Sequence, residues 1–160
     1  MSSSADRRKT VSVNRKARRD YFIEDSLEAG IALTGTEIKS VRAGRVNLAD
    51  SYVLLKDGEA WLLNTHIAPY RHASGSGHDP RRTRKLLLHR YQLDRLAGRV
   101  RQKGYTLVPL RMYLKNNRAK VEVALARGKK QYDKRRSLAE RDAKREVERA
   151  LARRRKGLDQ

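Results

Sequence analysis

The chain has 160 residues and carries 39 Lys and Arg against 18 Asp and Glu, a formal net charge of +21 at pH 7. This length corresponds to about one ordinary domain with extensions. Such a charge attracts dense arrays of phosphates, so nucleic acid is the expected partner and an anionic membrane is the rival. The chain has no cysteine, which excludes disulfide scaffolds, thiolate zinc sites and thiol nucleophiles.

The N-terminal region is basic and poor in apolar residues. Residues 1 to 20 hold seven Lys or Arg, and we interpret them as an arm outside the folded core. No apolar stretch approaches the length of a membrane span, and no apolar segment of a signal peptide follows the basic residues. We therefore expect a cytoplasmic protein with no membrane partner.

Residues 21 to 126 have the composition of a globular core, and their first part predicts a strand followed by a short helix. Alternation from Leu27 to Thr34 places Leu27, Ala29, Ile31 and Leu33 on one face and directs Glu28 outwards. Thr34 and Glu37 then have the spacing of a capping box, and Gly44 can end the helix.

The middle of the core predicts a hairpin, a loop and a second helix. Two strand-like runs surround Asp57-Gly58, a favoured dipeptide of type I′ turns. Residues 68 to 82 are interpreted as a long exposed loop. Apolar residues at helical spacing predict an amphipathic helix over about residues 87 to 103. Of Leu86, Leu87 and Leu88 we expect two to pack and one to project.

Two further strands are predicted around Asn116-Asn117. We expect one face of the first strand to be buried, and this face holds Val108, Leu110, Met112 and Leu114. The residues expected to point outwards are Arg111, Tyr113, Lys115 and Lys120. The whole pattern predicts a mostly β fold: a small antiparallel barrel of the oligonucleotide-binding type with flanking short helices and a basic C-terminal tail. A split-sheet α+β domain also fits the pattern.

The tail, residues 127 to 160, carries fourteen basic residues against six acidic ones. Ser137 and Glu140 have capping-box spacing, and Ala139, Ala143, Val147 and Leu151 form a thin apolar stripe. Burial of a mostly alanine stripe does not offset the cost of ordering the chain, about 1 to 2 kcal/mol per residue. We expect the tail to be disordered in the free protein and helical on a partner.

Several motifs together resemble the bacterial small protein B family, whose members bind transfer-messenger RNA. They are "NRKARRDYFIEDSLEAGIALTGTEIKSVRAGRVNLADSYV", "GEAWLLNTHIAPY", "DPRRTRKLLL" and "GKKQYDKRR". The resemblance implies a non-catalytic protein without cofactor. Its implied partners are transfer-messenger RNA, the ribosome at the decoding site and the mRNA channel, and elongation factor Tu through the complex with alanyl-charged RNA.

The resemblance also implies functional residues. Those expected to bind the tRNA-like end of the RNA, together with neighbouring basic and outward-facing residues, are Asn14, Arg15, Lys16, Arg18, Glu28, Lys85, Leu87, Arg111 and Tyr113. Those expected at the decoding site are Gly128, Lys129, Lys130, Tyr132, Asp133, Lys134 and Arg135. Tyr132 occupies a position where some members of the family carry His, and either ring can stack on an RNA base.

The residues alone raise three alternative interpretations. The first is a generic barrel that binds single-stranded RNA or assists ribosome assembly, with the tail as a nonspecific basic arm. The second is a magnesium-dependent nuclease built on Asp25, Glu28 and Glu37, which we reject because their spacing does not bring them together. The third is a metal site, which we do not expect because His66, His72, His78 and His89 do not match a tight ligand set.

Overall fold

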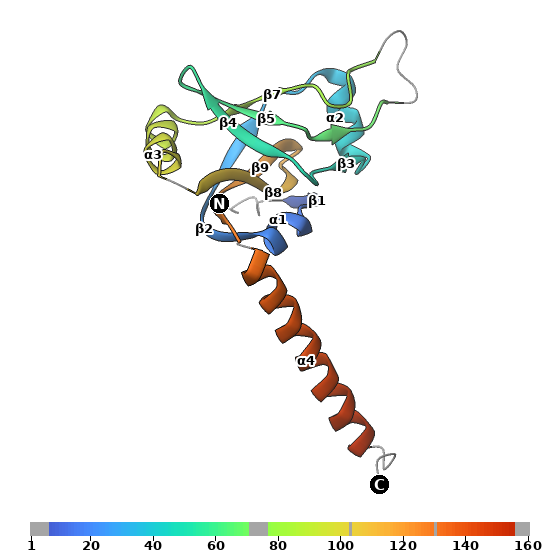
Figure 1. The fold of residues 1–160 in the computed structure, drawn as a ribbon. Coiled ribbons are helices and arrows are strands. Elements are labelled where there is room, and N and C mark those ends of the chain that lie inside the picture. Colours follow the sequence, from blue (N-terminus) through green and yellow to red (C-terminus); the bar gives the residue numbers. More distant parts are fainter. Residues whose placement is uncertain (1–6, 71–76, 103, 130, 156–160) are drawn as a thin grey trace, which may run out of the picture. The chain divides into compact units, whose positions relative to one another are not determined.

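The computed structural model describes residues 7–70, 77–102, 104–129 and 131–155. The chain divides into two units, Met1–Gly128 and Lys129–Gln160. The first unit contains an antiparallel sheet that closes partly into a ring, together with short helices (Figure 1). No helix among the described residues is long and apolar enough to cross a membrane.

The main sheet has the strand order β1-β8-β4-β5-β7-β2-β9, and a further pairing of β8 with β9 closes the ring. Its strands are β1 (Arg8–Val13), β2 (Tyr21–Ile31), β4 (Tyr52–Lys56), β5 (Glu59–Leu63), β7 (Arg84–Leu87), β8 (Tyr105–Lys115) and β9 (Arg118–Gly128). A small second sheet pairs β3 (Val46–Asn47) with β6 (His66–Ile67). The helices of this unit are α1 (Arg15–Asp20), α2 (Gly35–Arg42) and α3 (Arg90–Val100).

Both predicted hairpins are present, and their turns have the expected backbone. Asp57 and Gly58 have φ angles of 54° and 72°, and Asn116 and Asn117 have 51° and 65°. Two successive positive φ angles define a type I′ turn, whose twist matches that of the flanking strands. The first turn joins β4 to β5 and the second joins β8 to β9.

The predicted short helix is α2, and both of its ends follow from local sequence. The hydroxyl of Thr34 accepts a hydrogen bond from the backbone N–H of Glu37, and the Glu37 carboxylate accepts one from the N–H of Thr34. At the other end, Gly44 has a φ of 77°, and the N–H of Arg45 donates to the carbonyl of Ser40. This is a capping box at the N-terminus and a Schellman motif at the C-terminus.

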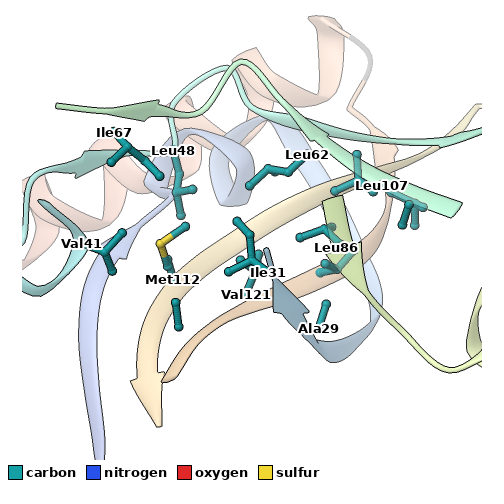
Figure 2. Packing of buried hydrophobic residues seen from close by; sticks show 14 of the residues in the cluster. Ala29, Ile31, Val41, Leu48, Leu62, Ile67, Leu86, Leu107, Met112 and Val121 are labelled. Atoms are coloured by element: carbon teal, nitrogen blue, oxygen red, sulfur yellow. The ribbon is translucent and has the colours of Figure 1, made fainter. Parts of the chain in front are cut away.

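The main core fills the inside of the ring (Figure 2). Ala29, Ile31, Met112 and Val121 point into it from β2, β8 and β9. The prediction that Val108 and Leu110 share a face with Met112 is wrong. The register of β8 against β9 shifts between Pro109 and Arg111, and such a bulge reverses the side-chain alternation. Val108 and Leu110 therefore lie in a second cluster, where they pack with Ala17 of α1.

The expected N-terminal arm does not match residues 8 to 20, which belong to the folded unit. β1 pairs with β8, and Val11 packs against the main core. Ala17 is buried in the second cluster. A few well-placed apolar residues suffice here because the bulge in β8 exposes a small apolar surface that α1 covers.

The expected helix over residues 87 to 103 is shorter in the structure, because its first residues belong to a strand. β7 pairs with both β2 and β5, and α3 begins only at Arg90. Leu86 is buried and Leu88 is half-buried, whereas Leu87 is 53% exposed. The expectation that two leucines pack and one projects is therefore confirmed. The reason differs from the one expected, because the leucines alternate in and out along a strand and not around a helix.

The second unit contains one helix, α4 (Gln131–Arg155). This helix begins upstream of Ser137, so the expectation that Ser137 caps its N-terminus is wrong. Leu138, Val147 and Leu151 are exposed. That the segment is disordered in the free protein and helical on a partner stays a prediction.

Candidate nucleic-acid interface

The outward side of the main sheet carries a row of charged side chains around Glu28. The backbone register places Glu28 of β2 opposite Glu122 of β9, and Glu122 opposite Arg111 of β8. The Arg111 Nε atom donates to the Glu122 Oε2 atom over 2.6 Å. The Tyr113 hydroxyl donates to Glu28, and the Lys115 Nζ atom lies 3.5 Å from Glu28 Oε1. We call this group the Glu28 network.

Tyr113 points to this outward side as predicted, but its neighbours cover it and it is only 2% exposed. The guanidinium carbon of Arg111 lies 4.7 Å from the centre of its ring, and that of Arg8 lies 5.7 Å away. Arg8 lies in β1, a segment that the sequence predicts to be an arm outside the core. The sequence therefore gives no indication that Arg8 covers the ring of Tyr113.

The Glu28 network fixes the protonation of its members. The hydrogen bond from Tyr113, opposed by partial burial and supported by the charge of Lys115, lowers the pKa of Glu28. Burial, together with the bond to Glu28, raises the pKa of Tyr113 to about 12. Glu28 is therefore a carboxylate and Tyr113 is a neutral hydroxyl donor near neutral pH. The remaining lone pairs of Glu28, which is 32% exposed, are free to accept from an incoming donor.

A groove of about 690 Å³ opens beside Glu28, between the sheet and the start of α3. Side chains along it include Glu28, Lys85, Leu87, His89, Tyr91 and Lys120. The Lys85 Nζ atom forms an ion pair of 2.9 Å with Glu59. The rings of His89 and Tyr91 stack with centroids 5.6 Å apart. The groove thus combines cations, an exposed Leu side chain and a flat aromatic surface.

Gly30 permits the exposed position of Leu87. The two residues are directly opposite in the pairing of β2 with β7. A Cβ atom on Gly30 would lie 3.1 Å from the Cβ atom of Leu87, a distance tighter than ordinary van der Waals contact. A larger residue at this position would push Leu87 out of its place in the groove wall.

A buried ionic cluster holds the start of β7, the strand that carries Lys85 and Leu87. Arg84 and Glu37 are both fully buried, and the Arg84 Nε atom lies 2.5 Å from Glu37 Oε2. Arg82 adds a contact of 2.6 Å to Glu37 Oε1, and Arg84 also donates to the carbonyl of Thr65 over 2.7 Å. The cluster ties β7 to α2 and to Thr65, the residue that precedes β6.

The charges in this cluster compensate one another. Burial alone would raise the pKa of Glu37, but hydrogen bonds from Arg82, the backbone of Thr34 and Arg84 outweigh it and lower the pKa to about 2. Sequence reasoning found the capping role of Glu37 and missed its buried partners. The only local signal was an Arg inside a run that reads as apolar.

Asn14 and Lys16 lie beside a second hollow, of about 280 Å³, at α1. Asn14 is 3% exposed. Its amide donates to the carbonyl of Pro109 over 2.8 Å and accepts from the N–H of Ala17 over 3.1 Å. Asn14 thus fastens α1 to the bulge of β8. Lys16 pairs with Asp50, which raises its pKa, and Arg15 and Arg18 are exposed on α1.

The sequence-predicted RNA-binding residues therefore fall into two places. Glu28, Lys85 and Leu87 meet at the groove, and Arg111 and Tyr113 join them through the Glu28 network. Asn14 and Lys16 line the second hollow, whereas Arg15 and Arg18 are exposed on α1 and do not line it. The groove also includes four residues that the sequence did not indicate as RNA-binding: Glu59, His89, Tyr91 and Lys120. For Tyr91 the available signal was an aromatic residue at the start of a predicted amphipathic helix.

The predicted decoding-site residues are only partly described. Gly128 ends β9 and Lys129 is half-buried. Lys130 lies outside the described residues. Tyr132, Asp133, Lys134 and Arg135 belong to the first turns of α4, where only the backbone is described.

The carboxylates weighed for a nuclease have separate partners. Asp25 pairs with Arg95, Glu28 with Tyr113, and Glu37 with Arg82 and Arg84. His78 bridges the hydroxyl of Thr36 and the carbonyl of Ile67, each over 2.9 Å. Over the described part of the chain no group of three metal-ligating side chains is found; His72 lies outside it.

A ring-closed antiparallel sheet with a strongly basic composition and a groove of cations and flat rings belongs to the class of β-sheet proteins that bind nucleic acid. Comparison with known proteins gives the family. The sequence model of the family described as "SmpB protein" matches residues 11–153. The chain belongs to the SmpB family, so the resemblance to small protein B is confirmed.

Relatives of the chain agree over nearly the whole length. An SsrA-binding protein of Roseiflexus sp. (strain RS-1) is 60% identical over 152 residues, which cover 94% of this chain and 96% of the relative. One of Acidothermus cellulolyticus (strain ATCC 43068 / DSM 8971 / 11B) is 59% identical over 150 residues, 94% of each chain. A solved chain from "tmRNA-SmpB: a journey to the center of the bacterial ribosome" is 50% identical, with a TM-score of 0.65 over 79% of this chain and 93% of that one.

Proposed function

We propose that this protein is a non-enzymatic RNA-binding factor that binds the tRNA-like domain of transfer-messenger RNA, also called SsrA RNA, and acts with it on stalled ribosomes in trans-translation. The observation that carries the proposal is the groove. It gathers Glu28, Lys85 and Leu87 from two separate motifs into one surface, in a chain whose relatives of about the same length are SsrA-binding proteins.

The groove has the chemistry that a folded RNA requires. Lys85 and Lys120 attract phosphates, and Leu87 and the stacked pair of His89 and Tyr91 offer apolar and aromatic surface to an unstacked nucleotide. Glu28 repels phosphates, so its place here needs a donor such as a base amine or a 2′-hydroxyl. Because Tyr113 and Lys115 hold the carboxylate in place, it selects for that donor without reorganisation.

The closed sheet is, in this proposal, a barrel of the oligonucleotide-binding type. Its antiparallel order and its closure by β8 and β9 support this assignment. Proteins of this architecture bind nucleic acid on the outward face of the sheet and in the adjoining loops. The groove lies on that face, at the junction of β7 and α3.

The C-terminal unit is proposed to sense the vacant decoding site and the empty mRNA channel. The protein reaches that site in the cytoplasm as a complex with alanyl-charged RNA and elongation factor Tu. Gly128 frees the chain from β9, Lys129, Lys130, Lys134 and Arg135 contact phosphates, Tyr132 stacks on an rRNA base, and Asp133 accepts a hydrogen bond. In the free protein the tail is disordered, and it becomes helical in the ribosome.

The test is a comparison of two RNAs of equal length, the tRNA-like domain and an arbitrary hairpin, at physiological salt. We expect nanomolar affinity for the first, a much weaker affinity for the second, and a steep fall of both with salt because several counterions are released. Equal affinity for the two RNAs would overturn the proposal. Glu28→Gln is the groove variant, and we expect it to weaken binding of the tRNA-like domain. Its matched control is Glu24→Gln, because Glu24 pairs with Arg99 away from the groove.

A further inference from the structure

The outward side of the β4–β5 hairpin carries four apolar or aromatic side chains that the core does not use. Tyr52 lies opposite Leu63 and Leu54 lies opposite Trp61, so the four residues form two adjacent cross-strand pairs. The intervening residues Val53 and Leu62 point inwards and are buried. We call Tyr52, Leu54, Trp61 and Leu63 the Trp61 strip.

The Trp61 strip is accessible and hollowed. Tyr52 is 44% exposed and Leu54 is 46% exposed. Leu54, Trp61 and Leu63 line a hollow of about 360 Å³ that also includes Thr83. Scattered single apolar residues are ordinary on a protein surface, but a contiguous apolar patch with charged residues at its rim marks a binding surface.

The strip joins the two places where the predicted RNA-binding residues lie. Glu59 lines both the hollow of the strip and the groove, and Trp61 is directly opposite Lys85 in the sheet. At its other end, Tyr52 lines the hollow that contains Asn14 and Lys16. A strand of RNA that contacts both places passes over the strip.

The charges around the strip suit an RNA strand. Lys85 and Lys56 lie at the groove end and Lys16 lies at the α1 end, so phosphates can be held at both ends while the middle is apolar. Surfaces that bind single strands combine a basic track with aromatic rings on which bases stack. A second copy of a chain with a net charge of +21 would be repelled, and a purely apolar partner would make no use of the lysines at the two ends.

We propose that the Trp61 strip is a stacking surface for one or two unpaired nucleotides of the same RNA that occupies the groove. This inference rests on the proposed function, and it adds a binding surface to it. Trp61 supplies the larger ring and Tyr52 the second, while Leu54 and Leu63 form the apolar floor. The bound bases are recognised by their flat faces and not by their edges, so the strip is tolerant of base identity.

Trp61 is itself the reporter, since it is the single Trp of the chain. We expect the tRNA-like RNA to quench the Trp emission of the full-length protein and to protect the ring from acrylamide. Base stacking is worth about 1 to 3 kcal/mol per base, so Trp61→Leu should weaken binding about 5- to 150-fold by filter binding. Leu54→Ala keeps the reporter and should reduce both the affinity and the quenching.

The matched control is Phe22→Leu, which removes an exposed aromatic ring (40% exposed) from a position outside the strip and should leave the affinity unchanged. Thermal unfolding of each variant shows whether it is folded. The stacking role of the strip would be overturned if RNA bound tightly without changing the Trp emission and if folded Trp61→Leu and Leu54→Ala kept the full affinity. This result would leave the proposed function standing.

Two further outcomes are separate from these. Failure of the unmodified protein to prefer the tRNA-like RNA over the hairpin would overturn the proposed function itself. A Trp61 emission that responds to protein concentration and not to RNA, together with a dimer in light scattering, would assign the strip to a second copy of the chain and overturn the inference.

Discussion

Both units of this chain carry an excess of positive charge, but they handle it in different ways. In the first unit, many of the basic side chains are paired with carboxylates, from the buried Glu37 and Arg84 to the outward Glu28 and Lys115. In α4 the apolar side chains Leu138, Val147 and Leu151 are exposed, and basic residues dominate its sequence. A unit that pairs many of its charges and buries its apolar residues specifies its shape alone, whereas we propose that the cationic helix, with its exposed apolar residues, is completed by a polyanion.

This contrast predicts that the two units can be separated by function. Deletion from Lys134 onward removes most of α4 and leaves the groove intact. We expect the affinity for the tRNA-like RNA to stay within about threefold of that of the full chain, and tagging of stalled peptides to be abolished. Filter binding and a reconstituted trans-translation assay measure the two quantities.

The truncation also discriminates against a generic RNA binder. If the tail were only a nonspecific basic arm, its loss would remove phosphate contacts and reduce the affinity and the salt dependence together. A charge-matched control carries the thirteen basic and six acidic residues that follow Arg127, in scrambled order. Tagging by this scrambled chain at the normal level would contradict a sequence-specific role of the tail.

The next largest effect concerns the buried ionic cluster of the first unit. Glu37→Gln leaves the guanidinium of Arg84 buried without a counter-charge, which costs about 3 to 5 kcal/mol when a buried pair is broken. Chemical denaturation measures this loss of unfolding free energy. Asp25→Asn breaks an exposed pair with Arg95 and should cost less than about 1 kcal/mol; equal costs for the two variants would contradict the assigned burial.

The same cluster sets a pH dependence. The pKa of Glu37 falls from an ordinary 4.5 to about 2 on folding, which corresponds to roughly 3 kcal/mol of stability. Because the folded value is the lower one, this stability is fully present above pH 4.5 and is lost as the pH falls towards about 2. Acid titration of the unfolding free energy should show a steeper fall in the unmodified protein than in Glu37→Gln.

A smaller effect is expected at the groove, where Tyr113 positions Glu28. Glu28→Gln should weaken RNA binding about 10- to 100-fold, because a hydrogen bond to a charged group contributes about 1.5 to 3 kcal/mol. Tyr113→Phe should lose part of this, and the double variant should lose less than the sum of the two. Tyr105→Phe removes a comparable hydroxyl that donates to Glu24 over 2.9 Å and should leave RNA affinity unchanged.

The pH profile separates positioning from a merely structural role of Tyr113. Its hydrogen bond lowers the pKa of Glu28, so in Tyr113→Phe the carboxylate takes up its proton at a higher pH. The RNA affinity of this variant should therefore begin to fall at a higher pH on acidification than that of the unmodified chain. Superimposable profiles would show that Tyr113 does not act through Glu28.

Local signals made much of the fold predictable from sequence. Asp57-Gly58 and Asn116-Asn117 tolerate two successive positive φ angles, and the capping box of Thr34 and Glu37 fixes the start of α2 within four residues. These features depend on neighbours in the chain. That one of Leu86, Leu87 and Leu88 projects was also predictable, because three successive leucines cannot all face one core.

Features set by distant contacts were not predictable. Leu110 forms the bulge of β8 next to Pro109, a residue that strands tolerate at edges and bulges, but the pairing with β9 decides which side chains the bulge buries. Arg84 is fully buried because Glu37, 47 residues away in the chain, meets it; an Arg in a sequence is otherwise expected on the surface. The Glu28 network likewise joins residues of β2 and β8, so the motif indicated Glu28 but not the residue that holds it.

The smallest expected effect tests the tail itself. Most of the stability of a helix in a protein comes from tertiary packing of its apolar face, and the stripe of Ala139, Ala143, Val147 and Leu151 offers little area to bury. The circular dichroism of the free full-length chain should therefore show less helix than expected if α1 to α4 were all formed. Helix-promoting solvent should raise the helix content to that expected value. The truncated chain is the matched control, since its spectrum should respond little to the same solvent. Amide protection of residues 138 to 153 in the free protein would mean that the chain specifies this helix without RNA, and the contrast between the two units would then be one of charge and not of order.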